Sequence, residues 1–243
     1  MQSWGLTDPG SVRKQNQDAY RMEQLDKNSL LCVVCDGMGG AKSGNIASTL
    51  AVEVFVEEVK RCWKPLMDGE KIDQVLRSAV KLANFTVYDQ AVQFEDFHGM
   101  GTTLVAALIR GRKVTVVNVG DSRAYGIDRS GIQQITKAHS LVQMMVDRGE
   151  LTPEVSKSYP GKNFITRAIG TEPIVMCDLF HRNVSRGDYL LLCSDGLSNM
   201  MDDQEILFEV VHGVNKQHCC KRLLNIAKNR GAPDNVTSIL VLI

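Results

Sequence analysis

The sequence predicts an α+β fold in which the strands form a β-sandwich and the helices cover it on the outside. Short apolar or β-branched runs occur in blocks at residues 30–35, 102–136, 176–193 and 236–243. Helical patterns fall in pairs between these blocks, which is typical of helices that pack on the faces of sheets. The chain contains no repeat, low-complexity stretch or linker, so we expect a single domain over residues 1–243.

The first half of the chain alternates one strand, two helices and four strands. Residues 30–35, LLCVVC, form a continuous apolar run that predicts a buried strand. Apolar side chains recur at near-helical spacing over 43–62 and 72–94, which predicts two helices. Strands are expected at 102–109, 113–119, 123–127 and 132–136. Tight turns at Gly111-Arg112 and Ser130-Gly131 favour an antiparallel meander for these four.

The second half begins with an expected helix at 140–148. The polar segment 149–163 carries Pro153 and Pro160 and is predicted to be a mobile surface segment. Strands are then expected at 176–182 and 189–193, helices at 203–211 and 217–229, and a closing strand at 236–243.

Composition restricts the class of protein. The 243 residues include 28 basic and 28 acidic ones, so no basic field favours nucleic acid or a membrane surface. The first ten residues are too polar for a signal peptide, and no apolar run reaches the roughly 20 residues of a membrane helix. The seven cysteines are odd in number and mostly lie in apolar runs, which indicates reduced thiols. We therefore expect a cytoplasmic protein.

Two groups of sulfur and nitrogen ligands have to be weighed as metal sites. Cys32 and Cys35 stand three positions apart on a predicted strand, so they face opposite sides and cannot share a metal without a bend. His218, Cys219 and Cys220 are adjacent in a predicted helix. Zinc is one interpretation of this group, and packing of the helix on the core is the favoured one.

Four aspartates stand where an apolar run meets a turn. Asp36 ends LLCVVC, Asp121 follows VTVVNVG, Asp195 follows YLLLCS, and Asp234 precedes the run VTSILV. If these strands lie side by side, the carboxylates converge at one rim, where Mg²⁺ or Mn²⁺ would neutralise them. Two such ions about 3.5–4 Å apart can hold and acidify a bridging water. The alternative for each aspartate is a plain turn, because Asp-Gly is a common turn dipeptide.

Eight motifs carry a resemblance to a known family. In chain order they are TDPGSVRKQNQDA, DGMGG, MGTTLVAAL, NVGDSRAY, HSLVQ, TRAIG, CSDGLS and PDNVTSILV, and they span essentially the whole chain. The sequence resembles the PPM family of metal-dependent serine/threonine phosphatases, also called type 2C phosphatases, and is most similar to bacterial members. The resemblance implies a four-layer α-β-β-α sandwich with a central antiparallel β-sandwich, a metal site at one end, and a flap at about 149–163.

The resemblance also implies the roles of individual residues. Asp36 would bridge two Mn²⁺ or Mg²⁺ ions, and the Gly37 carbonyl would bind one of them. Asp195 and Asp234 would hold the other ion, and Asp18 would support the site through metal-bound water. The remaining roles are a weaker third ion held by Asp121 with Asp195, and a grip on the substrate phosphate by Arg13.

The implied activity is hydrolysis of phosphoserine and phosphothreonine in proteins by a water or hydroxide that bridges the two ions. The implied partners are phosphorylated proteins, including a bacterial serine/threonine kinase and its substrates, with the chain acting as a monomer that binds neither nucleic acid nor membrane. A pseudophosphatase is the main alternative. A nucleotide-binding switch or kinase is another, but Ala41 in place of glycine before Lys42 breaks the phosphate-loop pattern.

Three positions depart from the family pattern. Ala41 replaces a histidine proposed as the proton donor, Asn45 replaces a glutamate, and Ala138 replaces an aspartate before His139-Ser140. The first departure questions a histidine general acid, so water on a metal ion would serve instead. The last removes one capping acceptor from the turn before the 140–148 helix and questions how the flap is anchored.

Overall fold

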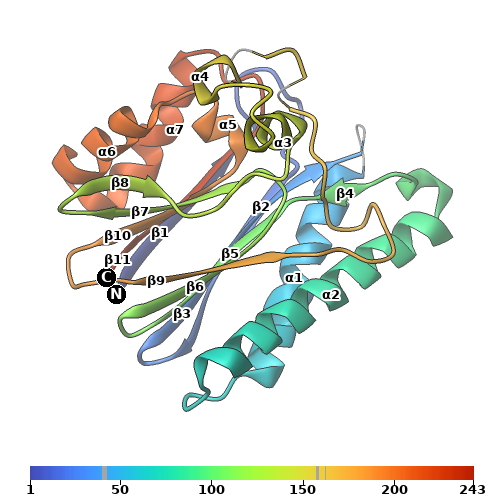
Figure 1. The fold of residues 1–243 in the computed structure, drawn as a ribbon, viewed down its shortest axis with the longest axis horizontal. Helices are drawn as coiled ribbons and strands as arrows, with labels where there is room; N and C mark the ends of the chain where they lie inside the picture. The colour runs from blue at the N-terminus through green and yellow to red at the C-terminus, as the bar shows by residue number, and fades with distance from the viewer. Residues whose placement is uncertain (40–42, 157–158, 162) are drawn as a thin grey trace.

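Two antiparallel β-sheets form the centre of the molecule (Figure 1). The structure is a computed structural model and describes residues 1–39, 43–156, 159–161 and 163–243. The first sheet has the strand order β1 (Gln2–Asp8), β11 (Val236–Leu242), β10 (Tyr189–Cys193), β7 (Arg123–Asp128) and β8 (Gly131–Gln134). The second has the order β2 (Asp18–Asp26), β3 (Ser29–Met38), β5 (Leu104–Arg110), β6 (Lys113–Val119) and β9 (Asp178–Asn183), and β4 (Gly101–Thr102) pairs with β3.

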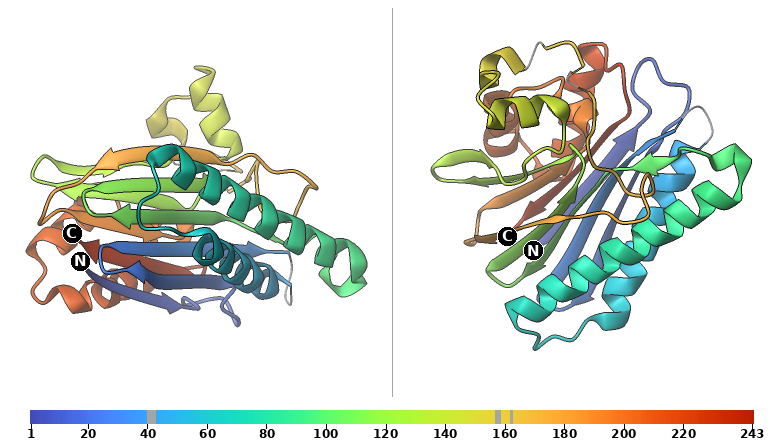
Figure 2. Two further views of the ribbon diagram at one scale, coloured as in Figure 1. Left: turned by 90° about the horizontal axis from the view of Figure 1, so that it is seen from below. Right: turned by 45° about the vertical axis from the view of Figure 1, so that its right-hand side comes forward.

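Helices cover the outer face of each sheet, so the molecule has four layers (Figures 1 and 2). The second sheet is covered by α1 (Gly44–Cys62) and α2 (Gly69–Gln93). The first is covered by α5 (Asp195–Ser198), α6 (Asp203–His212) and α7 (Cys219–Asn229). The short helices α3 (Leu141–Asp147) and α4 (Pro153–Ser156) stand at one end of the sandwich, and single 3-10 turns occupy η1 (Glu95–Phe97) and η2 (Lys216–His218). The predicted α+β sandwich is thereby confirmed.

Strand β3 explains why the run LLCVVC is apolar at every position. Leu30, Cys32 and Val34 belong to the core between the two sheets. The alternate side chains of the same run belong to the core beneath α1 and α2. A strand buried on both faces needs apolar residues on both, so the alternation of a half-exposed strand is missing.

The cysteines contribute to packing, and all seven are free thiols. Cys32 and Cys35 lie in different cores, on opposite faces of β3, as their spacing predicts. Cys219 and Cys220 are buried in the core beneath α7, which confirms the packing interpretation of that segment. Within the described residues, none of the helices combines the length and apolar character needed to cross a bilayer.

Several expectations about the elements are wrong. Strands 113–119 and 123–127 do not continue one meander, because β6 belongs to the second sheet and β7 to the first. The alternating pattern identifies a strand but not its sheet, and residues 120–122 carry the chain across between the two. Strands β1 and β2 were not expected, since their side chains are mostly half-buried and show no clear apolar period. The segment 149–163 contains the short helix α4, and its mobility stays a prediction, since residues 157, 158 and 162 within it lie outside the described part.

Candidate active site and metal centre

Four of the predicted site aspartates meet at one end of the sandwich. Asp18 and Asp36 stand opposite each other in the register of β2 and β3. Asp195 begins α5 just after β10, and Asp234 lies just before β11, so both stand at one end of neighbouring strands in the other sheet. The two pairs are close enough for Asp195 and Asp234 to raise the pKa of both Asp18 and Asp36. The sandwich therefore brings carboxyls from both sheets together.

Asp121 reaches the same place from the crossover between β6 and β7. Burial, together with the charges of Asp195 and Asp234, raises its pKa to about 7, against the lowering effect of Arg123. The predicted convergence of Asp121 on this rim agrees with that electrostatic contact. The turn itself is held by Ser122, whose hydroxyl lies 2.7 Å from the Thr103 hydroxyl.

Asp18 is the most deeply hydrogen-bonded carboxyl of the group. Its Oδ2 accepts from Ser194 Oγ at 2.7 Å and from Thr237 Oγ1 at 2.6 Å, which ties the second sheet to the first. Its Oδ1 is buried and has no hydrogen-bond partner among the described residues. Burial raises the pKa of Asp18 to about 7 although both hydroxyls lower it. A buried acceptor without a donor is costly, so this oxygen faces a place suited to a further donor or cation.

The backbone around Asp36 is fixed independently of its side chain. Its N–H donates to Thr103 Oγ1 at 2.9 Å, and its carbonyl accepts from the Thr103 N–H at 2.9 Å and from Thr102 Oγ1 at 2.9 Å. A Cβ on Gly37 would collide with the backbone carbonyls of Gly44 and Gln17, so only glycine fits after Asp36. The glycine after Asp36 is thus required by the close approach of α1 to β3, and not by a hairpin turn. Burial and the neighbouring carboxyls raise the pKa of Asp36 well above its usual range.

Arg13 stands at the exposed edge of this group. Its Nη2 lies 2.8 Å from Asp234 Oδ2, and about half of the arginine side chain is exposed. That ion pair, together with the charges of Asp36 and Asp195, raises the pKa of Arg13 further. Across the site, Asn199 Nδ2 donates to Asp195 Oδ2 at 3.0 Å. The guanidinium therefore lies beside the carboxyls at a half-exposed position on the wall of the site.

Asn235 supports the site, although the sequence predicts no role for it beyond its place in the motif PDNVTSILV. Its Nδ2 donates to the carbonyls of Pro9 and Gln15 at 3.0 and 2.9 Å, and its Oδ1 accepts from the Gln17 N–H at 2.8 Å. These bonds hold the loop between β1 and β2, which carries Arg13. The only available signal was the position of Asn235 directly after Asp234.

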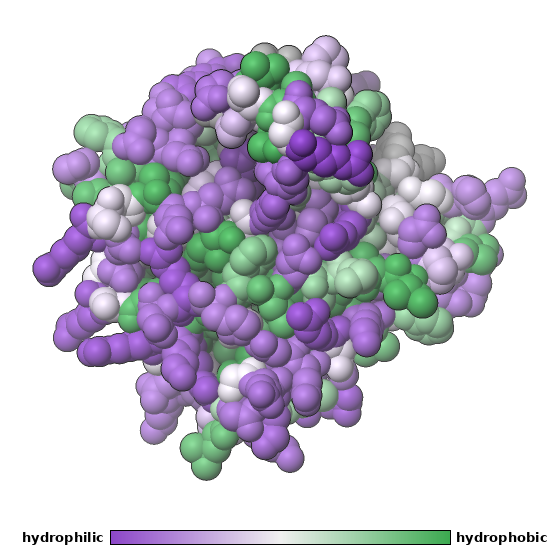
Figure 3. Space-filling model, in the orientation of Figure 1, coloured by the Kyte–Doolittle hydropathy of each residue, from purple (hydrophilic) through white to green (hydrophobic). Residues whose placement is uncertain are grey.

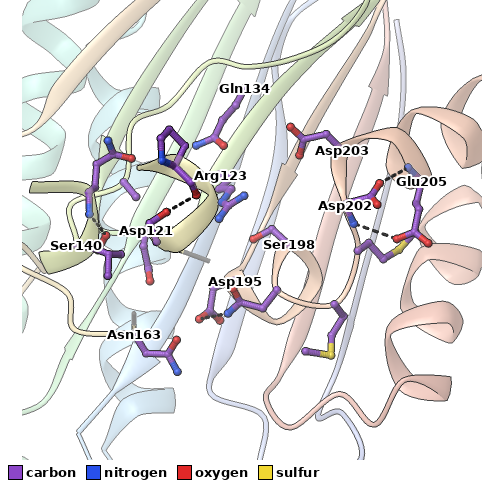
Figure 4. A pocket seen from close by; sticks show the side chains of 18 of the residues that line it. Asp121, Arg123, Gln134, Ser140, Asn163, Asp195, Ser198, Asp202, Asp203 and Glu205 are labelled. Atoms are coloured by element: carbon purple, nitrogen blue, oxygen red, sulfur yellow. Dashed lines mark hydrogen bonds between the residues drawn. The ribbon is translucent and has the colours of Figure 1, made fainter. Parts of the chain in front are cut away.

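Two adjoining clefts open onto the carboxyl group, and both are lined by Asp121, Asp195 and Asn163. One passes over Asp36 between Arg13 and Phe164. The other lies between the α3–α4 segment and the start of α6, and Figure 4 shows Asp121 and Asp195 at one end of it and Asp203 and Glu205 at the other. On the face shown in Figure 3, hydrophilic side chains dominate and apolar ones form small separate patches.

The three departures from the family pattern have different outcomes. Ala41 lies outside the described residues, and Asn45 is exposed on α1. The missing aspartate at Ala138 does not leave α3 uncapped, because Ser140 Oγ accepts from the Gln143 N–H at 3.3 Å. The anchoring of residues 140–165 is supplied by the backbone instead. The Leu141 N–H donates to the Phe164 carbonyl at 2.9 Å.

The donor set suits a hard divalent cation. Every predicted ligand atom is an oxygen, the carboxyls repel one another, and Asp18 Oδ1 is buried without a partner among the described residues. In the described part of the chain, no three His, Cys, Asp or Glu side chains already stand as a complete ligand group. Asp234 and Asp195 are instead engaged by Arg13 and Asn199. The residues therefore fit Mg²⁺ or Mn²⁺, provided that these two contacts yield.

Comparison with known proteins finds relatives that match nearly the whole chain. Residues 11–228 match the family described as Protein phosphatase 2C. The serine/threonine phosphatase stp of Listeria welshimeri is 35% identical over 238 residues, which cover 97% of this chain and 93% of that protein. PstP of Mycobacterium tuberculosis is 35% identical over 237 residues, which cover 96% of this chain and 43% of that longer protein.

Solved structures agree. The serine/threonine phosphatase Stp1 from Staphylococcus aureus superposes with a TM-score of 0.93 at 37% identity, over 99% of this chain and 94% of that one. Fold, carboxyl group and similarities together define a serine/threonine protein phosphatase. The chain belongs to the protein phosphatase 2C family.

Proposed function

We propose that this chain removes phosphate from serine and threonine residues of proteins with Mg²⁺ or Mn²⁺ bound among its carboxyls. The observation that carries the proposal is the buried Oδ1 of Asp18, which has no partner in the described part of the chain although carboxyls from both sheets surround it. Such a grouping is unfavourable unless cations neutralise it. The family to which the chain belongs depends on the same ions.

Each carboxyl has a distinct proposed role. Asp36 would hold both core ions, and the Gly37 carbonyl would bind one of them. Asp195 and Asp234 would bind the other, and Asp18 would support the site through water. When bound, such ions neutralise phosphate charge and lower the pKa of a water, which supplies the attacking oxygen.

Arg13 is proposed to bind the phosphate. A guanidinium offers a planar fork of donors that matches phosphate oxygens, and Arg13 lines the same cleft as Asp234. Asp121, with Asp195, is proposed to hold a weaker third ion, because it adds a single carboxyl from a separate loop. These contacts would orient the phosphate.

The remaining proposals concern the flap beside the cleft, the compartment in which the chain acts, and its phosphoprotein partners. We propose that residues 1–243 act as one domain and that residues 149–163 form a flap beside the cleft, where Pro153, Ser156 and Asn163 line its wall. The seven free thiols fit a reducing compartment, which supports action in the cytoplasm. A bacterial serine/threonine kinase and its substrates are the proposed source of phosphoproteins, since the named relatives are bacterial phosphatases.

The test is hydrolysis of a phosphothreonine peptide with Mn²⁺ and with chelator. Wild type should release phosphate only with metal, and Asp36→Asn should release none. Asp96→Asn, which changes an exposed aspartate in η1, is the matched control and should match wild type. Full activity of wild type after exhaustive metal removal would exclude the proposed chemistry. Metal binding without turnover would instead indicate a pseudophosphatase.

A further inference from the structure

His139 makes two hydrogen bonds to the turn that bears Asp121, donating in one and accepting in the other. The His139 N–H donates to the Gly120 carbonyl at 2.9 Å. The Gly120 N–H donates back to Nδ1 of the His139 ring at 3.0 Å. Both groups are buried, so neither bond is exchanged with water. The residue directly before Asp121 is thus clamped to this histidine.

The ring is restricted to one protonation form by these contacts. A backbone N–H can only donate, so Nδ1 must accept and the single ring proton lies on Nε2. Nε2 then donates to Asp178 Oδ2 at 3.1 Å. Arg167 Nη1 donates to the other oxygen of Asp178 at 3.0 Å and keeps that carboxylate aimed at the ring. Arg167 Nη1 also lies 3.1 Å from Nε2, and it cannot donate there, because Nε2 already carries a proton.

The turn has little other freedom. Gly120 has φ +105, and a Cβ there would lie 2.7 Å from Thr103, so the backbone is packed tightly against this residue between β4 and β5. Asn118 Nδ2 bonds the carbonyls of Gly120 and Lys137 at 3.2 and 3.1 Å. His139 holds both the N–H and the carbonyl of Gly120. The backbone before Asp121 is therefore fixed, and with it the direction in which the Asp121 carboxyl leaves the chain.

The backbone of His139 also stands at the root of residues 140–165. Its carbonyl accepts from the Thr166 N–H at 2.8 Å, where that segment returns to the core. The next residue, Ser140, bridges to Ile165 and caps α3. One residue thus contacts the Asp121 turn, strand β9 and both ends of the segment that walls the cleft.

We propose that His139 is a positioning residue for dephosphorylation, whose neutral ring locks the Asp121 turn to the root of residues 140–165. His139 lines neither of the two clefts and is not among the proposed metal or phosphate ligands. Its loss should therefore lower kcat and leave KM nearly unchanged. This inference rests on the proposed function for the role of Asp121, whereas the geometry of the ring does not.

Three variants separate the two bonds of the ring. His139→Asn keeps an acceptor at the place of Nδ1, His139→Gln keeps only a donor toward Asp178, and His139→Ala removes both. On a phosphoserine peptide, kcat should fall roughly ten- to a hundredfold for the alanine and glutamine variants, as expected for a small misplacement in a site. The asparagine variant should retain most of the wild-type kcat. His181→Asn is the matched control, because His181 bonds Asp73 at 2.9 Å away from both clefts and its loss should not affect kcat.

Nuclear magnetic resonance of the Mg²⁺-loaded protein gives a readout independent of turnover. The ¹⁵N shifts of His139 should show a bare Nδ1 and a protonated Nε2. The Gly120 amide signal should move and exchange faster in the glutamine and alanine variants but not in the asparagine variant. A ring protonated on Nδ1, equal kcat in all variants, or rescue by glutamine rather than asparagine would overturn the proposal. If the alanine variant fails to fold, the asparagine–glutamine pair still decides, and an inactive wild type with the expected shifts would refute the proposed function alone.

Discussion

Arg13 Nη2 lies 2.8 Å from Asp234 Oδ2, so the proposed phosphate-binding cation is ion-paired with a proposed metal ligand. The two residues are 221 positions apart in the chain and meet only because β1 and β11 are neighbours. Both side chains are partly exposed, which makes the contact weak and easy to exchange. Arg13 can therefore turn to a phosphate while Asp234 turns to a cation.

Arg13→Ala should raise KM for a phosphopeptide about tenfold or more, since hydrogen bonds to a charged partner contribute about 1.5–3 kcal/mol. The kcat should fall only if the contact tightens in the transition state. Steady-state kinetics at saturating Mn²⁺ measures both. Lys14→Ala removes a neighbouring cation of the same cleft and serves as the control. Unchanged kinetics for Arg13→Ala would remove this residue from the site.

Asp36→Asn and Asp195→Asn should abolish turnover and keep the fold. In chelator at pH 7.5, either variant should melt at the same temperature as wild type or higher, because each removes a carboxyl whose ionisation is opposed by burial and by the neighbouring carboxyls. Phosphate release and thermal denaturation test the two parts separately. A variant with near-normal turnover, or one that melts well below wild type, would contradict the assignment.

The metal-free protein should lose stability as the pH rises. Asp18 and Asp121 both have a pKa raised to about 7, against an ordinary value of 3.8. In the unfolded chain they ionise first, so the stability present at low pH is lost progressively until the folded carboxyls ionise near pH 7. In chelator, the melting temperature of the wild type minus that of Asp18→Asn should therefore decline between pH 5 and about pH 7. A difference that grows in favour of wild type over this range would refute the raised pKa values.

Asp121→Ala should lower kcat more for a phosphoserine peptide than for p-nitrophenyl phosphate. The proposed role of this carboxyl is to help deliver a proton to the departing oxygen, and a nitrophenolate leaves readily without one. Two tightly bound ions should remain, as measured by calorimetry. Equal losses on the two substrates would argue against proton delivery, and no loss on either would leave Asp121 as a turn residue.

Much of the molecule follows from short-range pattern. The helical spacing of 43–62 and the apolar run of 189–193 predict elements that the structure contains nearly residue for residue as α1 and β10. The motifs predicted the family, because their residue types and their order along the chain are specific to it. The aspartates could be selected in the same way, since each stands beside an apolar run.

Only the tertiary structure decided how these pieces meet. The sequence by itself determined most of the strands after residue 28, but not β1 and β2, and not that β6 and β7 lie in different sheets, because a period of two is the same in either sheet. It also could not show that Asn235 holds Gln17, 218 positions away, or that His139 accepts from Gly120. Such bonds depend on which strands become neighbours, and that choice is made by burial of whole faces rather than by any local run of residues.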